Sequence, residues 1–294
     1  MLHPVETVKA LRSVRAELKG KVGLVPTMGA LHEGHLALIR AARQDNDSVI
    51  ATIFVNPTQF APGEDFAAYP RDLDHDLGLL ERAGVDFVFT PPPEEVYPPG
   101  FQTYVNAEVV STGLEGDRRP GHFKGVATVV AKLFNMTQPD RAYFGQKDAQ
   151  QVVVVRRMVR DLNFPIEIVV CPTMREQDGL ALSSRNAYLN MAQREAASVI
   201  YRSLRAAADA YADGERMPST LRGIVRNVLE TEPLAQIDYV AVNDPHTLFG
   251  IHDTTNDPIL LSVVVQIGKP RLLDNCLLPW SLNNRADLTN ILGA

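Results

Sequence analysis

The chain is poor in cysteine and has no long apolar run. Its 294 residues include two cysteines, Cys171 and Cys276, which are too few and too far apart for a disulfide framework or a Cys-x-x-Cys metal or redox site. We therefore predict that both are packing thiols. The longest apolar clusters, such as residues 259–265, are far shorter than the ~20 residues that a bilayer-spanning helix needs. The composition thus excludes a disulfide-rich scaffold and predicts a protein without membrane spans.

Positive charge is also scarce. There are 29 Lys and Arg residues against 35 Asp and Glu residues, a net charge of −6. Because affinity for a nucleic-acid backbone depends on a basic surface, we expect no nucleic-acid partner. An anionic small substrate would need a few local cations and the amides of helix N-termini. Residues 1–6 lack the basic and apolar blocks of a signal peptide, so we expect a cytoplasmic location.

The first part of the chain alternates short apolar runs with helical patterns, which is typical of a doubly wound parallel sheet. The predicted strands are 22–25, 49–55, 85–89, 141–144 and 166–170, and the predicted helices are 35–45, 72–83, 126–135 and 149–162. In the last helix we expect an apolar stripe of Val152, Val155, Val159 and Leu162 to cover the sheet.

The pattern changes after Pro172. Residues 192–229 predict two helices broken near 213–214, and strand patterns follow at 237–242 and 259–267. We therefore predict two domains: a Rossmann-like doubly wound domain over 1–173 and a smaller α+β lid domain over 174–294.

A histidine pair follows the first strand, in the segment 26–35. Ligands of open parallel sheets bind beyond the carboxyl ends of strands, where a helix N-terminus favours phosphate. Gly29 and Gly34 allow close backbone approach, while His32 and His35 lie three residues apart on one face. We favour phosphate binding. A metal pair, for which the third ligand is missing, and ordinary helix-start residues stay as alternatives.

Two polar clusters follow further along the chain. Residues 56–60, Asn-Pro-Thr-Gln-Phe, suit hydroxyl and carboxylate recognition but also suit a turn. Asp72, Asp74 and Asp76 could approach a magnesium ion, and they equally suit the start of a helix, where carboxylates offset the dipole.

Cations mark three later segments. Lys147 follows the fourth predicted strand and offers a point charge for phosphate, with Gln151 one helical turn beyond it. Asp148 suits a helix cap or a ribose ligand. Arg185 lies in the predicted hinge and suits a mobile phosphate clamp. The basic segment 116–125 fits a substrate lid, a partner surface or a solvated loop.

Together these motifs resemble the pantoate–β-alanine ligases, also called pantothenate synthetases, of the nucleotidylyltransferase superfamily. The resemblance covers nearly the whole chain in the correct order. The segments that carry it are 26–35, 54–60, 119–123, 145–148 and 183–186. The His-x-x-His box alone would indicate only the superfamily, whereas Asn-Pro-Thr-Gln-Phe and Arg-Pro-Gly-His-Phe narrow it to the family.

The resemblance implies a homodimer in which the domain 1–173 binds ATP and pantoate and the domain 174–294 covers the site. It implies ATP as co-substrate with Mg²⁺, and condensation of (R)-pantoate with β-alanine to give pantothenate, AMP and pyrophosphate through pantoyl adenylate. The alternatives are another nucleotidylyltransferase that activates a different small acid, and a catalytically silent nucleotide-binding or scaffold protein.

The resemblance also implies residue roles. His35 would donate a proton or hydrogen bond to phosphate, assisted by His32, Lys147 and Arg185. Gln59, Gln151 and Asn56 would bind pantoate or β-alanine. The implied ATP contacts are Met28, Gly29, Ala30, Leu31, His32, Glu33, Gly34, His35, Gly145, Gln146, Lys147, Asp148, Met174, Leu182, Ser183, Ser184 and Arg185.

The sequence departs from the family pattern at three positions. Gln146 stands where many relatives carry Glu, and His75 and Leu79 stand where metal ligands are expected. The magnesium ligands are therefore left unassigned.

Overall fold

The computed structural model describes residues 2, 4–61, 63 and 66–293 and divides them into two compact units. The first unit contains the described residues up to Gly145, together with 150–171 and Gly293. The second contains 146–149 and 172–292. The chain therefore enters the second unit for residues 146–149 and then returns to the first unit. It enters the second unit again at Pro172, two residues before the predicted start of the lid domain at residue 174.

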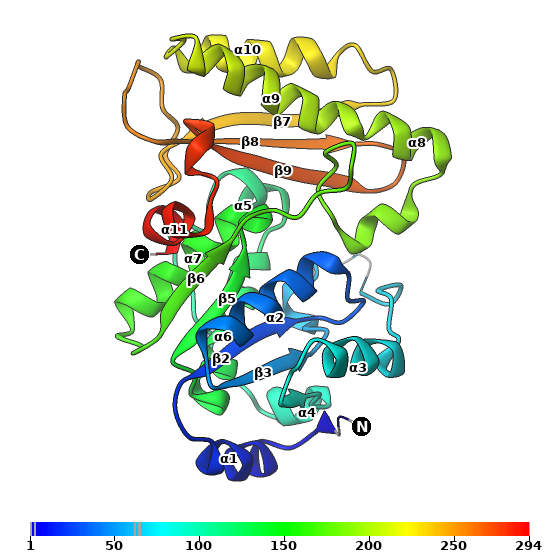
Figure 1. Cartoon of the computed structure of the whole chain (residues 1–294), viewed down its shortest axis with the longest axis vertical. Coiled ribbons are helices and arrows are strands. Elements are labelled where there is room, and N and C mark those ends of the chain that lie inside the picture. Colours follow the sequence, from blue (N-terminus) through cyan, green and yellow to red (C-terminus); the bar gives the residue numbers. More distant parts are fainter. Residues whose placement is uncertain (1, 3, 62, 64–65, 294) are drawn as a thin grey trace. The chain divides into compact units, whose positions relative to one another are not determined.

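The first unit is built on a six-stranded parallel sheet in the order β1-β4-β3-β2-β5-β6 (Figure 1). Its strands are β1 (Pro4–Val5), β2 (Val22–Thr27), β3 (Ser48–Ile53), β4 (Phe87–Phe89), β5 (Arg141–Gly145) and β6 (Glu167–Cys171). The strand order reverses between β2 and β5, which is where parallel sheets bind ligands beyond their carboxyl ends. The predicted Rossmann-like sheet is confirmed, and β1 was too short to predict.

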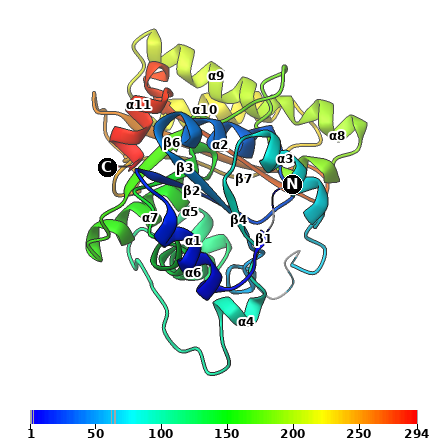
Figure 2. The ribbon, with the colours of Figure 1, turned by 60° about the horizontal axis from the view of Figure 1, so that its bottom comes forward.

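Helices cover both faces of this sheet (Figure 2). The helices of this unit are α1 (Val8–Glu17), α2 (Glu33–Asp45), α3 (Leu73–Arg82), α4 (Pro93–Val96), α5 (Leu114–Arg118), α6 (His122–Thr137) and α7 (Ala149–Asp161). The connections β2-α2-β3 and β5-α7-β6 run in opposite directions across the sheet. Since such crossovers are right-handed, α2 and α7 lie on opposite faces, so central strand residues such as Leu24 and Ile50 are fully buried.

The predicted apolar stripe of α7 is partly wrong. Val152 and Val155 are fully buried, but so are Val153 and Val154, because this helix is enclosed on more than one side. Leu162 is 51% exposed, since α7 ends at Asp161 and the chain turns away after it.

The second unit pairs a three-stranded antiparallel sheet with helices (Figure 1). Its strands are β7 (Gln236–Asn243), β8 (Ile259–Gln266) and β9 (Arg271–Leu278), and its helices are α8 (Met191–Ala196), α9 (Ser198–Ala212), α10 (Pro218–Leu229) and α11 (Arg285–Leu288). Leu204, Leu221 and Val263 belong to one buried cluster between α9, α10 and the sheet. The predicted helix break near 213–214 and the two predicted strands are confirmed.

β9 was not predicted, because Asp274 and Asn275 interrupt its apolar pattern with residues that disfavour strands. Both side chains are nonetheless buried. The two cysteines are buried as predicted, and desolvation raises the pKa of the Cys276 thiol, which keeps it neutral. Within the described part of the chain, no helix combines the length and apolarity that a membrane crossing requires.

One close approach ties α6 to the segment after β3. A Cβ on Gly125 would lie 2.3 Å from the carbonyl oxygen of Thr58 and 2.7 Å from the nitrogen of Gln59. Because these are backbone atoms, Gly125→Ala should lower the free energy of unfolding by about 1–3 kcal/mol, as overpacking does. The measurement is urea denaturation.

Gly78→Ala is the matched control in the same unit. Gly78 lies inside α3, where a Cβ would meet only the flexible end of Arg82 at 3.4 Å. Alanine should therefore stabilise by about 0.5–1 kcal/mol. Equal effects of the two substitutions would contradict the close packing of α6.

Candidate active site

The histidine segment forms a tight loop between β2 and α2. Thr27 Oγ1 accepts from the nitrogen of Gly29 and donates to the carbonyl of Thr52 on β3. Gly29 and Ala30 then take left-handed conformations, with φ of 80° and 50°. His32 caps α2, so the positive end of a 13-residue helix begins at this loop.

The two imidazole rings are locked in a reciprocal capping box. His32 Nδ1 accepts from the nitrogen of Gly34 at 3.1 Å, and His35 Nδ1 accepts from the nitrogen of His32 at 3.3 Å. The ring centroids lie 4.1 Å apart. Because each Nδ1 acts as an acceptor, a neutral ring carries its proton on Nε2. The two rings therefore place two Nε2–H groups side by side, and the phosphate role of these histidines stays a prediction.

A buried carboxylate from α3 fixes the loop that leads to these rings. Asp76 is 1% exposed and its two oxygens accept from the nitrogens of Ala30 and Leu31, each at 2.9 Å. Burial raises the pKa of Asp76, and the two backbone hydrogen bonds oppose that shift. A Cβ on Gly29 would lie 2.9 Å from Asp76 Oδ2, so the loop and the carboxylate fit closely.

The neighbouring aspartates do not assemble a metal centre. Asp72 caps α3 by accepting from the nitrogen of His75, and Asp74 is exposed in the first turn. Among the described residues there is no group of three or more His, Cys, Asp or Glu side chains that could hold a metal ion. The contact of Asp72 matches the helix-start reading, whereas Asp76 instead holds the loop before α2.

The amides after β3 form a second buried cluster. Asn56 is 1% exposed; its Oδ1 accepts from Thr58 and from the hydroxyl of Tyr97, and its Nδ2 donates to Gln59 Oε1 at 3.0 Å. Burial raises the pKa of Tyr97, so its hydroxyl stays a neutral donor. The contacts of Asn56 are those of a residue that holds Gln59, while its direct contact with substrate stays a prediction.

Gln59 has one polar group that can change partner. It is 9% exposed, and its Nε2 donates to the sulfur of Met28 at 2.9 Å. A thioether is a weak acceptor, so a substrate oxygen can replace it at little cost. Met28 and Gln59, both predicted site residues, are thereby brought together.

The basic segment 116–125 is mostly helical, with α5 ending at Arg118 and α6 beginning at His122. His122 is 9% exposed; its Nδ1 lies 2.8 Å from the carbonyl of Gln59 and its Nε2 lies 3.1 Å from Arg119 Nη1. Since guanidinium groups only donate, Nε2 accepts and Nδ1–H donates to Gln59. The sequence left this segment as a substrate lid, a partner surface or a solvated loop, and those alternatives stay open. The structure adds that His122 in this segment holds the backbone of Gln59.

Sequence reasoning also missed Gln150. Its Oε1 accepts from the nitrogen of Glu115, and its Nε2 donates to the carbonyls of Val110, Thr112 and Gly113. This buried amide holds the start of α5. Its neighbour Gln151, the predicted pantoate ligand, is half-buried on α7.

In the second unit, Lys147 lies in a 3₁₀ turn, Gln146–Asp148, directly after β5. Its side chain is 21% exposed, and Nζ lies 3.7 Å from Asp148 Oδ1. Exposed pairs of this kind contribute about 0–1 kcal/mol, so Lys147 can exchange Asp148 for a phosphate at little cost.

The remaining predicted ATP contacts of this unit lie on one folded-back segment. The nitrogen of Leu182 donates to the carbonyl of Met174, and Arg175 pairs with Ala181 in an antiparallel bridge. Ser183 Oγ then caps a 3₁₀ helix, Ser184–Tyr188, by accepting from the nitrogen of Arg185. Met174, Leu182, Ser183, Ser184 and Arg185 are thus brought together by backbone pairing.

Fold and motif together define a Rossmann-like α/β protein with a His-x-x-His box on the N-terminus of the helix after β2. A family model described as Pantoate-beta-alanine ligase matches residues 3–277. The chain belongs to the pantoate–β-alanine ligase family, as the motifs predicted.

Individual relatives and solved structures support the same family assignment. The chain is 58% identical to a pantothenate synthetase of Roseiflexus sp. (strain RS-1), over 94% of this chain and 99% of that one. It is 59% identical to one of Chloroflexus aurantiacus, over 93% and 97%. A pantothenate synthetase structure from Thermus thermophilus has a TM-score of 0.88 at 49% identity, covering 93% of this chain and 98% of that one.

A further structure comes from Francisella tularensis. It is a pantoate–β-alanine ligase described as complexed with βγ-ATP and β-alanine, with a TM-score of 0.76 at 37% identity, covering 94% of this chain and 98% of that one.

The anchor role of Asp76 can be tested by Asp76→Asn. The amide turns one of the two acceptors into a donor that faces a backbone N–H, which should lower the free energy of unfolding by about 1–3 kcal/mol. Asp72→Asn is the control on the same helix, because Asn caps helices as well as Asp does. Denaturation curves should separate the two variants, and an unchanged Asp76→Asn variant would contradict the anchor.

Proposed function

We propose that this chain condenses (R)-pantoate with β-alanine, using ATP and forming pantothenate, AMP and pyrophosphate through a pantoyl-adenylate intermediate. The observation that carries the proposal is the family match over residues 3–277. The pair of Nε2–H donors at the positive end of α2 supports it, because adenylation develops charge on phosphate oxygens.

The first step needs no general base. Carboxylic acids are ionised at neutral pH, so pantoate can attack the α-phosphorus directly and pyrophosphate leaves. The neutral amine of β-alanine then attacks the acyl carbon, and the C–O bond to AMP breaks with its electron pair leaving on the AMP oxygen. The nitrogen loses a proton to solvent, which gives the amide. Catalysis therefore reduces to positioning and stabilisation of charge.

In the first unit, His35 and His32 would donate from Nε2 to phosphate oxygens. Gln59 would release the sulfur of Met28 and donate to pantoate, and it would also lie near β-alanine. Gln151 completes the pantoate ligands in this proposal. The backbone of 28–35 would follow the nucleotide, since it is a closely held loop at the positive end of α2.

In the second unit, Lys147 and Arg185 would neutralise phosphate charge as pyrophosphate departs, as cationic clamps do in phosphoryl transfer. Asp148 would bind the ribose. Met174 and the segment 182–185 would contact ATP.

We also propose Mg²⁺ as the ion carried by the ATP phosphates, with no protein ligand assigned. Asp76, the buried carboxylate that holds the histidine loop, already accepts two backbone N–H groups and is not a vacant ligand. A homodimer, as the family resemblance implies, and a cytoplasmic location, as the sequence analysis expects, complete the proposal.

The direct test is to incubate the protein with ATP, Mg²⁺ and pantoate and detect the adenylate by mass spectrometry, then add β-alanine. Pantoyl adenylate should accumulate first and convert to pantothenate and AMP. Pyrophosphate release with another acid but not with pantoate would favour a different nucleotidylyltransferase. ATP binding by calorimetry without turnover would favour a silent binding protein.

Substitution of His35 should distinguish the structural role of its Nδ1 from the proposed catalytic role of its Nε2–H. His35→Asn keeps an acceptor near the position of Nδ1 for the capping box but removes the Nε2–H donor. Adenylation in a single turnover should fall by ~10²-fold or more, with little loss of stability, as when one oxyanion donor is removed. His35→Ala and Lys147→Ala should fall by a similar factor. Near-normal single-turnover rates in these variants would contradict the assignment.

A further inference from the structure

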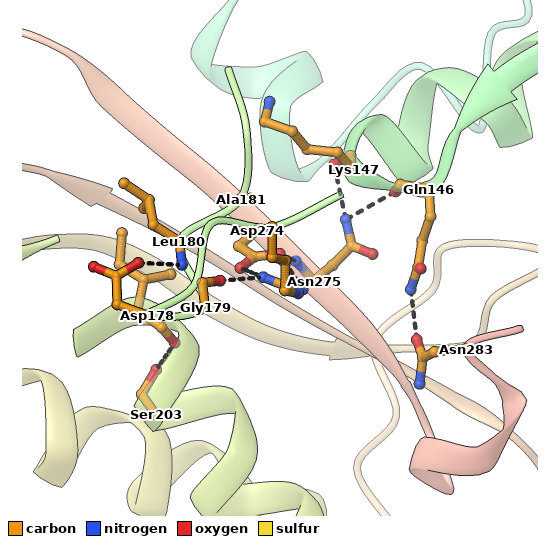
Figure 3. A network of polar contacts seen from close by, with 12 residues as sticks. Gln146, Lys147, Asp178, Gly179, Leu180, Ala181, Ser203, Asp274, Asn275 and Asn283 are labelled. Atoms are coloured by element: carbon orange, nitrogen blue, oxygen red, sulfur yellow. Dashed lines mark hydrogen bonds and ion pairs between the residues drawn. The ribbon is translucent and has the colours of Figure 1, made fainter. Parts of the chain in front are cut away.

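A buried asparagine on β9 holds the backbone that carries Lys147. Asn275 is 1% exposed, and its Nδ2 donates to the carbonyls of Gln146 at 3.1 Å and Lys147 at 2.8 Å (Figure 3). The turn Gln146–Asp148 begins directly after the last residue of β5, so these carbonyls lie outside the parallel ladder. Because buried carbonyls need donors, Asn275 supplies donors that the sheet does not.

The orientation of this amide is fixed by its neighbours. A flipped side chain would place Oδ1 against two carbonyl oxygens, which cannot donate. Within the described residues, Oδ1 itself is buried and has no hydrogen-bond partner. The side chain of Asn275 therefore acts only as a hydrogen-bond donor to the turn. Its two hydrogen bonds go to the carbonyl of Lys147, whose ammonium group is the proposed phosphate ligand, and to the carbonyl of Gln146.

A second contact fixes the same turn from the other side. Gln146 is 2% exposed, and its Nε2 donates to Asn283 Oδ1 (Figure 3). Asn283 cannot flip, because Oδ1 also accepts from the nitrogen of Leu277 and Nδ2 donates to the carbonyls of Leu277 and Trp280. Only a donor at position 146 satisfies this arrangement. An ionised Glu at position 146 would lack that donor, so Gln146 suits the asparagine that this chain has at 283.

Lys147 is thus fixed at its backbone and loosely held at its tip. Among the described residues, its ammonium group forms one ion pair, the 3.7 Å pair with Asp148. The region that Nζ can reach therefore depends on where the turn places the backbone of Lys147. Misplacement of a charge-stabilising group by ~1 Å can reduce a rate by 10²-fold.

We propose that Asn275 is a positioning residue, which fixes the Lys147 backbone so that Nζ meets the ATP phosphates, with Gln146 and Asn283 as the supporting contact. This rests on the proposed function for the target of Nζ, whereas the anchoring of the turn stands on the contacts themselves.

The test is Asn275→Asp, which keeps the size of the side chain but sets a carboxylate oxygen against two carbonyl oxygens. The chain offers a matched control on β7. Asn243 is 6% exposed, its Nδ2 donates to the carbonyl of Leu248, and its Oδ1 also has no partner in the described chain. Asn243→Asp makes the same chemical change in the same sheet, away from the turn.

Both variants should lower Tm by a similar amount. Only Asn275→Asp should lower kcat for pantoate-dependent pyrophosphate release, by ~10- to 100-fold. If the aspartate variants do not fold, Asn275→Ala and Asn243→Ala replace them, because alanine removes the donor without adding charge. The same difference in kcat is then expected between the two alanine variants. Equal loss of kcat in the 275 and 243 variants would overturn the proposal.

A double variant separates positioning from general damage. If Asn275 acts through Lys147, Asn275→Asp should cost less than ~3-fold in a Lys147→Ala background, because coupled residues are non-additive. A full 10- to 100-fold loss in that background would overturn the proposal.

Hydrogen exchange gives a readout that does not depend on activity. Amides of 146–149 should exchange faster in Asn275→Asp than in the parent protein, and at the parent rate in Asn243→Asp. If the parent protein does not turn over pantoate, the proposed function fails, and this measurement still decides whether Asn275 holds the turn. Unchanged exchange in Asn275→Asp would overturn the anchoring.

Discussion

The geometry of the first unit depends on one buried carboxylate. Asp76 accepts the backbone N–H groups of Ala30 and Leu31 from a position that is 1% exposed, at the point where the chain turns from β2 into α2. The left-handed Ala30 would be strained without such partners, since non-glycine residues rarely adopt φ near 50°. The capping box of the two histidines begins directly after this turn, so the direction of both rings follows from a contact made by α3.

The second unit solves a similar problem with amides in place of a carboxylate. Asn275 and Asn283 lie in or beside β9, and they hold a turn whose sequence neighbours belong to the first unit. The turn 146–148 presents carbonyl groups, and the amide of Asn275 donates to them. The loop before α2 presents N–H groups, and the carboxylate of Asp76 accepts from them. In each unit, the backbone that carries a proposed site residue is held by a buried polar side chain.

The positions of the reactive groups were largely readable from the sequence. Glycines, histidines and a lysine after apolar runs predict loops at the carboxyl ends of parallel strands, and the structure has them there. The supporting residues were not readable. Asp76 looked like one of three helix-start carboxylates, and Gln150 and His122 gave no periodic signal. β9 was missed because Asn275, which holds the turn 146–148, and its neighbour Asp274 interrupt the apolar pattern of the strand. Such contacts join residues 35 to 137 positions apart, and no local pattern records them.

The central claim is that the carboxylate of pantoate attacks the α-phosphorus of ATP at a site organised for charge stabilisation. It can be tested with pantoate labelled with ¹⁸O in its carboxylate. When β-alanine displaces AMP, the bridging oxygen stays on phosphorus, so one ¹⁸O atom should appear in AMP and none in pyrophosphate. Label in inorganic phosphate, or AMP without label, would contradict the account.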